Sequence, residues 1–598
     1  MIISSTVREP ETIYHKTQLC VIGGGLAGMG AAISAARKGT KVVLMQDRPV
    51  LGGNASSEIR MWIRGASGKD IRETGLLEEI ALENIYRNPN MNYSIWDSIL
   101  WEKVMLEENI TLLLNCSCLD AKMKDHRITS IKGWQMTTQQ YHCVEADIFA
   151  DCSGDSILAP LTGAMYRVGR EGRDEFGEDI APAVSDEKTM GLSCLMQVRE
   201  TNRKVKFIAP KWANKYSKDD FPYRIDFSTP TKWTEDNFWW MEIGGTRDSI
   251  RDTESLRDEL IKIAYGVWDF LKNSGEVESE NWDLEWMGFL PGKRESRRYV
   301  GDYILKQDDL RSGIIFDDII AYGGWTMDDH DPAGFETRNR PTVWNPVTSP
   351  YGIPYRCIYS CNVDNLMFAG RNISVTHSAN SSTRVMATCA MLGHALGNAA
   401  HIAICEQFLP RDLMNGYIEE LKQSLIEDDC YLPGNKKELS VLMRHASVQA
   451  TSGKAELLTD GMDRNEENCE HLWVGESGSE ITIELPKESY AEKLRLVFDS
   501  DLNRSTWTTQ KGYVKTYPLV CNRFLDDEAL KVPETLLKEY DVLIKTGECQ
   551  EWQPLYSETN NYQRLVFIPV NASIRALKFI PRNTWGAKQV GIFSMELK

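Results

Sequence analysis

Three features that would assign the chain to common functional classes are missing from the sequence. No apolar run approaches the roughly 20 residues that a helix needs to cross a bilayer. Positive charge is not in excess either, since 68 Lys and Arg stand against 86 Asp and Glu, a formal net charge of −18. Nucleic-acid binders need a clustered positive surface. The first 20 residues show no basic start and no apolar stretch of signal-peptide length. We therefore expect no nucleic-acid partner, no membrane partner and no export.

Closely spaced cysteines are also scarce. The 14 cysteines are spread over 598 residues, and the closest pairs, Cys116/Cys118 and Cys357/Cys361, belong to no C-x-x-C metal set. We expect reduced, mostly buried thiols, a cytoplasmic protein and no metal site. Cys194 lies in an apolar segment, which favours a buried thiol over a reactive one.

The pattern of apolar residues predicts an α/β core followed by an all-β region. An apolar strand at 19–22, a glycine turn, a small-residue helix and a second strand at 41–45 form a βαβ order, which is typical of a parallel sheet. Further buried strands are predicted within 109–123 and 146–155. Helices are predicted at 252–275 and 412–429. The first has an apolar stripe of Leu256, Leu260, Ile263, Val267 and Leu271, with Gly275 at the position of a C-terminal cap. After about residue 440, short alternating runs predict an antiparallel sandwich.

The glycine turn after the first strand has the spacing of a dinucleotide-binding site. Gly23, Gly25 and Gly28 occupy the G-x-G-x-x-G positions between a strand and a helix. They would allow a tight turn, close approach of a pyrophosphate and close packing of the helix on the sheet. The helix N-terminus would offer free N–H groups to phosphates. The second strand ends at Gln46 and not at an acid, and Asp47 follows one residue later.

Later motifs indicate which dinucleotide binds. "LGGN" (51–54), "CSGD" (152–155) and "AGRN" (369–372) follow in order along the chain. Together with "GKRESRR" (292–298) and "IPYR" (353–356), they resemble the FAD-dependent oxidoreductase family of the glutathione-reductase and fumarate-reductase superfamily, from about residue 17 to about 430. The resemblance implies FAD and a redox reaction, and it identifies no substrate. Nothing in the sequence demands a covalent flavin link, so we expect noncovalent FAD. A helix starting near Arg384 would direct its N-terminus at the flavin.

The resemblance also implies a fold and a set of cofactor contacts. The fold is α/β + β: a Rossmann-like, GR2-type FAD-binding core (three-layer β/β/α) with an inserted α+β substrate domain and a C-terminal antiparallel β-sandwich. Gln46, Asp47 or both would hold the adenosine ribose. The implied cofactor residues are Gly23, Gly25, Leu26, Ala27, Gly28, Gln46, Asp47, Arg48, Gly52, Gly53, Asn54, Cys118, Cys152, Ser153, Gly154, Asp155, Gly370, Arg371, Arg384, Val385 and Met386.

The C-terminal region looks like a galactose-binding-like module. "LLTDG" (457–461), Trp473 and "ITIELP" (481–486) resemble the opening of a discoidin-type sandwich, which would either bind a ligand or serve a structural or oligomer-forming role. The predicted domains are the first part of the FAD-binding domain (1–165), the substrate or cap domain (166–340), the second part of the FAD-binding domain (341–410), a helical linker (411–440) and the sandwich (441–598).

Two histidines are the candidates for proton transfer, because His titrates near neutral pH. His330 lies between Asp329 and Asp331, and would be a catalytic base, a substrate-binding residue or a structural histidine held by its flanking acids. His377 lies in the segment expected beside the flavin, where it would act at the flavin edge or stabilise a loop.

Two arginines are candidates for substrate recognition. Arg297 belongs to a basic cluster that would recognise a carboxylate or sugar hydroxyls, or would form salt bridges at a domain junction. Within that cluster we expect Arg297 to be the buried arginine. Arg356 of "IPYR" is in a similar position.

The sequence therefore predicts an FAD-dependent oxidoreductase that transfers a hydride between flavin and a small polar substrate, plausibly a sugar or glycoside. Indole rings stack on sugars, and the middle region is rich in tryptophan: Trp233, Trp239, Trp240, Trp282, Trp286 and Trp325. The alternatives are an alkene reductase or desaturase of the fumarate-reductase type and a noncatalytic, FAD-containing carbohydrate-binding protein. The electron acceptor is unknown, and a homo-oligomer is possible.

Overall fold

The computed structural model describes residues 9–229, 232–234, 237–504, 506–508, 514–516, 522–547, 549 and 551–598. Residues 1–8, part of the N-terminal stretch considered above for export, lie outside the described residues. Among the helices of the described part, none is both long and apolar enough to span a bilayer. The chain forms two compact units. The first comprises Met1–Arg64, Leu100–Leu421 and Leu519–Leu525, and the second comprises Gly65–Ile99, Lys422–Pro518 and Asp526–Lys598.

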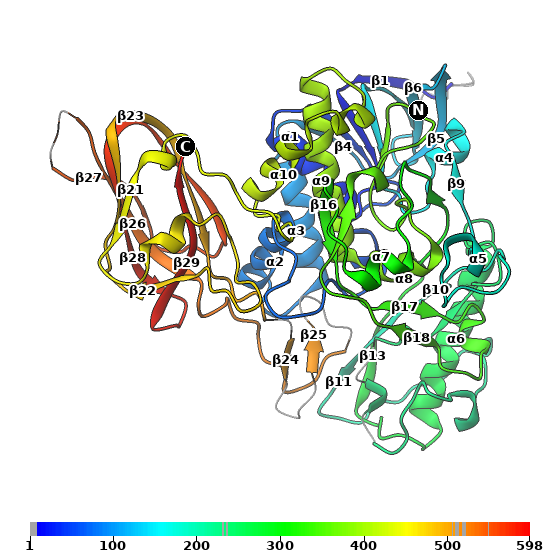
Figure 1. The fold of residues 1–598 in the computed structure, drawn as a ribbon. Helices are drawn as coiled ribbons and strands as arrows, with labels where there is room; N and C mark the ends of the chain where they lie inside the picture. The colour runs from blue at the N-terminus through cyan, green and yellow to red at the C-terminus, as the bar shows by residue number, and fades with distance from the viewer. Residues whose placement is uncertain are drawn as a thin grey trace, which may run out of the picture. The chain divides into compact units, whose positions relative to one another are not determined.

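The first unit contains a buried parallel sheet, of which β4 is labelled in Figure 1. Its strand order is β20-β8-β2-β3-β4, and every neighbouring pair is parallel. All residues of four of these strands are buried, as expected of a parallel sheet covered on both faces. The predicted βαβ order is confirmed. The strands are β2 (Leu19–Ile22), β3 (Val42–Met45), β4 (Ile110–Leu113), β8 (Ile148–Asp151) and β20 (Leu366–Phe368).

Two helices from distant parts of the sequence pack closely against each other in this unit. They are α1 (Leu26–Arg37) and α9 (Met386–Cys405). A Cβ added at Gly393 of α9 would lie 1.9 Å from the carbonyl oxygen of Ala27, and one at Gly397 would lie 2.3 Å from a backbone oxygen of α1. Only glycine permits so close an approach. The contact fixes the start of α9 beside the turn that opens α1.

A second sheet and several small sheets complete the first unit. The second sheet has the order β1-β7-β6-β5, in which β1 is parallel to β7 and the other pairs are antiparallel. Its strands are β1 (Thr12–Lys16), β5 (Cys116–Lys124), β6 (Arg127–Gln135) and β7 (Gln140–Glu145). The small sheets pair β9 (Tyr166–Arg167) with β15 (Arg298–Tyr299), β11 (Met196–Glu200) with β13 (Trp282–Met287), β16 (Ile319–Gly323) with β19 (Tyr351–Pro354), β17 (Met327–His330) with β18 (Thr342–Asn345), and β10 (Leu192–Ser193) with β12 (Glu242–Ile243) and β14 (Gly292–Lys293).

The long amphipathic helix predicted at 252–275 is α6 (Thr253–Asn273). Every residue of its predicted apolar stripe is buried, and Gly275 beyond its end has the left-handed φ of 77°. The predicted helix at 412–429 is shorter, α10 (Ile418–Glu427). The remaining α-helices are α2 (Leu76–Arg87), α3 (Tyr93–Met105), α4 (Leu158–Thr162), α5 (Arg173–Phe176), α7 (Gln307–Ser312) and α8 (His377–Thr383).

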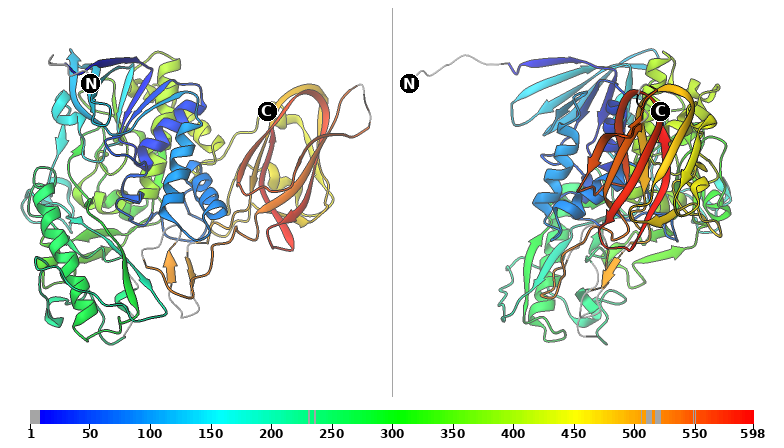
Figure 2. Two further views of the ribbon diagram at one scale, coloured as in Figure 1. Left: turned by 180° about the vertical axis from the view of Figure 1, so that it is seen from behind. Right: turned by 90° about the vertical axis from the view of Figure 1, so that its left-hand side faces the viewer.

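The second unit contains the predicted C-terminal antiparallel sandwich, in yellow to red in Figure 2. The strand order is β22-β29-β23-β28-β26-β27, β21 pairs with β23, and all pairs are antiparallel. A separate ribbon joins β24 (Thr506–Thr508) and β25 (Val514–Thr516). The sandwich strands are β21 (Ser447–Ala450), β22 (Trp473–Glu476), β23 (Ile481–Phe498), β26 (Leu537–Lys545), β27 (Gln553–Glu558), β28 (Leu565–Thr584) and β29 (Gln589–Leu597).

A helix from the first hundred residues completes the core of this sandwich. Ala81, Leu82 and Ile85 of α2 are buried in the same apolar cluster as the sandwich strands. Arg464 of the sandwich region donates to the carbonyl oxygens of Asp70 and Arg72, both at 3.0 Å. The segment 65–99 therefore folds as part of the second unit, which the sequence patterns did not predict.

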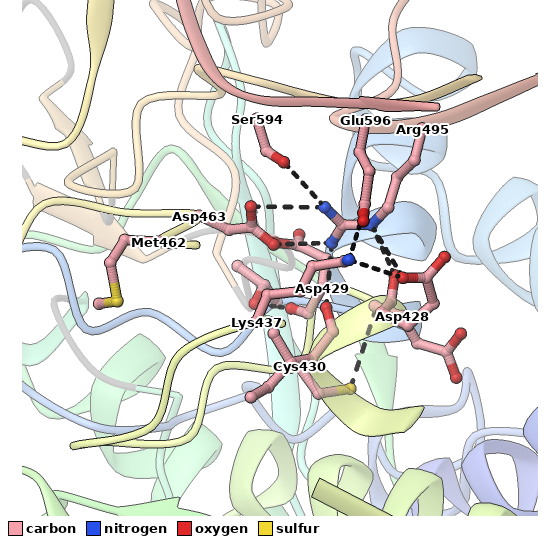
Figure 3. Close-up of polar contacts among 12 residues, drawn as sticks. Asp428, Asp429, Cys430, Lys437, Met462, Asp463, Arg495, Ser594 and Glu596 are labelled. Atoms are coloured by element: carbon pink, nitrogen blue, oxygen red, sulfur yellow. Dashed lines mark hydrogen bonds and ion pairs between the residues drawn. The ribbon is translucent and has the colours of Figure 1, made fainter. Parts of the chain in front are cut away.

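Arg495 is the centre of a buried ionic cluster in the second unit (Figure 3). Its Nη2 lies 2.6 Å from Asp463 Oδ2 and its Nη1 lies 3.2 Å from Ser594 Oγ. Its other donors reach Asp463 Oδ1 and the carbonyl oxygens of Ile426 and Glu427. All five guanidinium N–H groups thus have acceptors. Burial opposes the charge, but the ion pair with Asp463 raises the pKa of Arg495 above its ordinary value.

We expect Arg495→Met to lower the free energy of unfolding of this unit by about 3–5 kcal/mol, because it leaves a buried carboxylate unpaired. Arg444→Met is the matched control. It breaks an exposed pair with Glu438 and should cost less than about 1 kcal/mol. Denaturant unfolding of both variants measures the difference. Equal stabilities would show that the cluster makes no net contribution.

Candidate functional site

The first glycine turn exposes backbone that no side chain covers, which a cofactor phosphate needs in order to approach closely. Gly23 follows β2 with a left-handed φ of 99°, and a Cβ there would lie 2.5 Å from the carbonyl oxygen of Cys152. A Cβ at Gly28 would lie 1.7 Å from the carbonyl oxygen of Gly23. Gly25 differs, because a Cβ there would meet nothing closer than 3.8 Å. Only at Gly25, of the three, does the turn itself leave room for a side chain.

The second glycine pair lies directly against this turn. Gly52 donates its N–H to the carbonyl oxygen of Gly24 at 2.8 Å, with a φ of 98°. A Cβ at Gly53 would lie 3.1 Å from Gly25 Cα. Two glycine-rich backbones, 28 residues apart at Gly25 and Gly53, therefore face each other. Such paired bare backbones suit a pyrophosphate, which binds through N–H groups and close approach.

Gln46 ties these two segments together. The N–H of Gly24 donates to Gln46 Oε1 at 2.6 Å, and Gln46 Nε2 donates to the carbonyl oxygen of Val50 at 3.2 Å. A Glu could accept the first bond but could not donate the second. Asp47 is exposed, and Arg48 lies 3.3 Å from Glu58. The glutamine is thus explained by the loop it holds, and its contact with a ribose stays a prediction.

Asp155 connects three segments that the sequence motifs singled out. Its carboxylate lies 2.6 Å from Lys293 Nζ and 2.7 Å from Arg371 Nη2. Burial alone would raise the pKa of Asp155, but these two cations outweigh burial and lower it to about 2. A Cβ at Gly154 would lie 2.8 Å from Arg371 Cζ, so this glycine makes room for the guanidinium. The "CSGD", "GKRESRR" and "AGRN" segments are therefore brought together.

Buried polar atoms without a hydrogen-bond partner gather in the segment 372–384. They are Asn372 Oδ1, both amide atoms of Asn380, Thr383 Oγ1 and Arg384 Nε. Asn372, Asn380 and Thr383 are fully buried. Buried polar atoms are almost always hydrogen-bonded in folded proteins, so these atoms require partners from a bound molecule or from ordered water. Together with the bare glycine turns, they fit FAD.

The other predicted cofactor residues lie on the same elements. Leu26 and Ala27 are buried in the first turn of α1, Val385 is the N-cap of α9, and Met386 begins that helix. Asn54 donates to the carbonyl oxygen of Lys293 at 3.1 Å. Cys118 is buried on β5, and burial raises its pKa to about 12. Ser153 and Gly370 belong to turns, with a φ of 115° at Gly370.

His330 lies between two carboxylates at the end of β17. Its Nδ1 is 2.6 Å from Glu242 Oε2, whereas its Nε2 is 3.4 Å from Asp328 Oδ2. Arg294 Nη1 holds the same Glu242 oxygen at 3.3 Å. The Trp239 ring meets the imidazole edge-on, with centroids 5.2 Å apart. One nitrogen of His330 is therefore firmly bound and the other is weakly bound.

His377 also bridges two carboxylates, but more tightly. Its Nδ1 is 2.8 Å from Glu295 Oε2 and its Nε2 is 3.1 Å from Asp329 Oδ1. Burial alone would lower the pKa of His377, but the two carboxylates outweigh burial and raise it to about 10. The imidazole is a fixed cation at neutral pH. The backbone N–H of His377 adds a bond to Glu171 at 2.8 Å.

The structure corrects one expectation about the basic cluster. Arg297 is only partly buried, with its guanidinium over the Tyr166 ring at 5.6 Å. The buried arginines are Arg294 and Arg298, because they have the buried acids Glu242, Glu171 and Glu295 as partners. Charged side chains are rarely buried unless they are paired.

Arg356 forms a bidentate pair with Asp318, at 2.9 and 3.1 Å. Its predicted role in substrate recognition stays untested by these contacts. Cys194 is buried as expected, and burial raises its pKa to about 12. Every cysteine among the described residues is a free thiol. The described part of the chain contains no cluster of His, Cys, Asp or Glu suited to a metal ion.

Sequence reasoning did not identify several members of this site. Glu242, Arg294, Glu295 and Asp328 are all buried or nearly so and contact the two histidines or their partners. Asn380 was missed as well. Asn380 comes three residues after His377, and residues three apart share a helix face, so the sequence could have placed Asn380 beside His377.

A parallel sheet with two facing glycine turns and a polar, incompletely hydrogen-bonded segment defines a dinucleotide-binding protein. The chain belongs to the FAD dependent oxidoreductase family, whose model matches residues 18–425. No curated protein matches the chain.

The chain also resembles solved carbohydrate-binding modules at low identity. The family 32 module from Streptococcus pneumoniae EndoD is 13% identical, with a TM-score of 0.20, and the match covers 27% of this chain and 99% of the module. CpGH89CBM32-6 produced by Clostridium perfringens is 17% identical, with a TM-score of 0.16 and coverage of 26% and 93%. The family 32 module from C. perfringens NanJ in complex with galactose is 9% identical, with a TM-score of 0.18 and coverage of 27% and 97%.

We expect Gly25→Ala to weaken FAD binding about tenfold to a hundredfold, since overpacking costs about 1–3 kcal/mol. The apoprotein should keep its stability, because the added Cβ meets no protein atom closer than 3.8 Å and Gly25 has an ordinary φ of −67°. Gly28→Ala is the contrasting variant, since its Cβ would overlap the Gly23 carbonyl and should destabilise the apoprotein itself. FAD titration of apoprotein and thermal unfolding separate the two effects. An unchanged FAD affinity in Gly25→Ala would contradict the assignment of this turn as the pyrophosphate-binding site.

The raised pKa of His377 predicts a loss of stability at alkaline pH. A folded pKa of about 10 lies above the ordinary value of 6.5, so the stabilisation is complete below about 6.5 and disappears as pH rises through about 10. We expect His377→Gln to be less stable than wild type at pH 7 and to show a flatter decline between pH 7 and pH 10. Denaturant unfolding across this range measures both slopes. Parallel curves would contradict the assignment of a buried imidazolium.

Proposed function

We propose that the protein transfers a hydride between FAD and a small polar substrate that carries a hydroxyl group, with a sugar or glycoside as the favoured class. The observation that carries the proposal is the Glu242–His330 pair, which has one nitrogen firmly oriented and the other weakly held. FAD, when bound, supplies the acceptor for a hydride that leaves the carbon bearing the hydroxyl.

His330 is the proposed base for the hydroxyl proton. Glu242 accepts the Nδ1–H at 2.6 Å and orients the ring, so Nε2 is the nitrogen that would take the hydroxyl proton. The contact of Nε2 with Asp328, at 3.4 Å, is long enough for a substrate hydroxyl to replace it. Glu242 is a positioning residue, and Arg294 keeps it ionised by lowering its pKa against the effect of burial.

His377 has a different proposed role. Because its two carboxylate contacts hold it protonated, it cannot accept a proton at neutral pH. It contributes positive charge and orients Asp329 beside Asp328. The two histidines thus divide the work, with proton transfer at His330 and charge compensation at His377.

The residues that would hold noncovalent FAD follow from the two glycine turns and the unpartnered atoms. Gly23, Gly25, Gly52 and Gly53 would surround the pyrophosphate, while Asn380 and Thr383 would bond the rest of the cofactor. We propose that the two sheets and the α1–α9 pair form the Rossmann-like, three-layer GR2 arrangement, with the predicted domain boundaries except that the segment 65–99 belongs to the second unit. The N-terminus of α9 would face the flavin.

Two further parts of the proposal concern the setting of the protein. Free thiols throughout the described residues support a reducing, cytoplasmic location. Helix α2, which belongs to the segment 65–99, packs into the sandwich core, and this packing supports a structural role for the sandwich. The proposal also includes a homo-oligomer and an unidentified electron acceptor that reoxidises the flavin.

Anaerobic reduction of the bound flavin by a panel of sugars, glycosides, hydroxy acids and succinate-like acids tests the function. We expect sugars or glycosides to bleach the flavin. Bleaching by succinate-like acids alone would favour the alkene reductase, and no bleaching by any compound would favour a noncatalytic protein.

His330→Ala should slow flavin reduction by about 10²- to 10⁴-fold, the usual contribution of a general base. Glu242→Gln should slow it less and shift its pH profile. His126→Ala, which changes an exposed histidine, is the matched control and should reduce at the wild-type rate. Full activity in His330→Ala would exclude this base.

A further inference from the structure

The proposed base lies on a hairpin that carries an exposed tryptophan on the same face. In the antiparallel pair of β17 and β18, His330 is opposite Thr342 and Asp328 is opposite Trp344. Directly opposed residues lie on the same face of a sheet, as do alternate residues along one strand. The hydroxyl of Thr342 donates to Asp328 Oδ1 at 2.5 Å, which agrees with this arrangement. These four side chains therefore share one face.

Trp344 does not belong to the buried aromatic core of this unit. It is 60% exposed, whereas Trp233, Trp240 and Trp282 are buried in the core. It stands two residues along the strand from the partner of His330, a distance of about 7 Å. The indole of Trp344 therefore lies next to the proposed reacting position at His330, two residues along the hairpin.

One aromatic ring contacts the base, and a second stands on the same hairpin. Trp239 meets the His330 ring edge-on at 5.2 Å, and Trp344 stands on the hairpin beyond Asp328. Asp328 and Asp329 keep 16% and 24% of their side-chain surface exposed. A sugar ring offers an apolar C–H face that an indole covers and hydroxyls that carboxylates accept. The indole of Trp344 and the partly exposed carboxylate of Asp328 share one face and match that chemistry, whereas Asp329 points to the opposite face.

We propose that Trp344 is the stacking platform for a second ring of a glycoside substrate, whose reacting hydroxyl lies at His330. The inference rests on the proposed oxidation of a sugar hydroxyl and deepens it, because it makes the preferred substrate a molecule of at least two rings. Trp344 would determine specificity and would not take part in the proton or hydride step.

Binding to the oxidised holoenzyme tests the platform without turnover. The probes are methyl glucoside and methyl galactoside, with one sugar ring, and cellobiose and lactose, with two. Titration calorimetry should show that at least one disaccharide binds the wild type and binds Trp344→Ala about 5- to 100-fold more weakly, the range that stacking on an aromatic side chain commonly gives. Binding of the methyl glycosides should change less than about twofold. Trp344→Phe should retain most of the affinity.

Two controls address nonspecific effects. Val343→Ala changes the adjacent residue, which is 58% exposed but points to the opposite face, and Trp212→Ala removes a 50% exposed indole elsewhere. Both should bind disaccharides as the wild type does.

The outcomes separate this inference from the proposed function. Equal disaccharide affinity in wild type and Trp344→Ala, or no disaccharide binding by the wild type, overturns the platform even if sugars bleach the flavin. Weaker binding in Trp344→Ala supports the platform even if no sugar bleaches the flavin, in which case only the proposed reaction fails. During reduction by a bleaching disaccharide, Trp344→Ala should raise the half-saturating concentration and leave the limiting rate unchanged.

Discussion

The candidate site depends on the compensation of two adjacent, partly buried acids. Asp328 and Asp329 follow each other on β17, so their carboxylates point to opposite sides of the strand. Each reaches a histidine, and each histidine reaches a buried glutamate on its other side. An uncompensated charge at either place would cost several kcal/mol. The requirement for partners therefore brings β12, the basic segment around Arg294 and α8 to one strand.

In the second unit, too, a buried charged group needs partners, and there the protein itself supplies them. There Arg495 satisfies all five of its donors within the protein, and its acids are paired. Along α8 of the first unit, by contrast, Asn380 and Thr383 are buried with atoms that bond to nothing in the protein. Glu427 Oε1 in the Arg495 cluster also has no hydrogen-bond partner among the described residues, so one such atom does not indicate a ligand; the unpartnered atoms of the first unit are informative because they gather in the segment 372–384.

Local patterns predicted much of the fold, because they depend on residues near in sequence. The glycine turn at 23–28, the strands around it and the stripe of α6 are examples. The pairing of His330 with Glu242 spans 88 residues and that of His377 with Glu295 spans 82, and no local period encodes either. Arg297 was wrongly expected to be buried for the same reason, since only distant acids decide which neighbouring arginine is enclosed. The assignment of 65–99 to the second unit also depends on distant partners.

The different roles proposed for the two histidines rest on their contact distances, which composition cannot reveal. Both are buried, and each contacts one aspartate and one glutamate. At His377 both contacts are 3.1 Å or shorter, so the imidazolium is held and a proton cannot be taken up. At His330 the contact with Asp328 stretches to 3.4 Å. A hydroxyl that enters there gains a nitrogen acceptor and leaves Asp328 with Thr342 and Arg384 as partners. Asp328 thus keeps its charge compensated whether or not substrate is bound, which is the condition for a base that must exchange partners in a buried site.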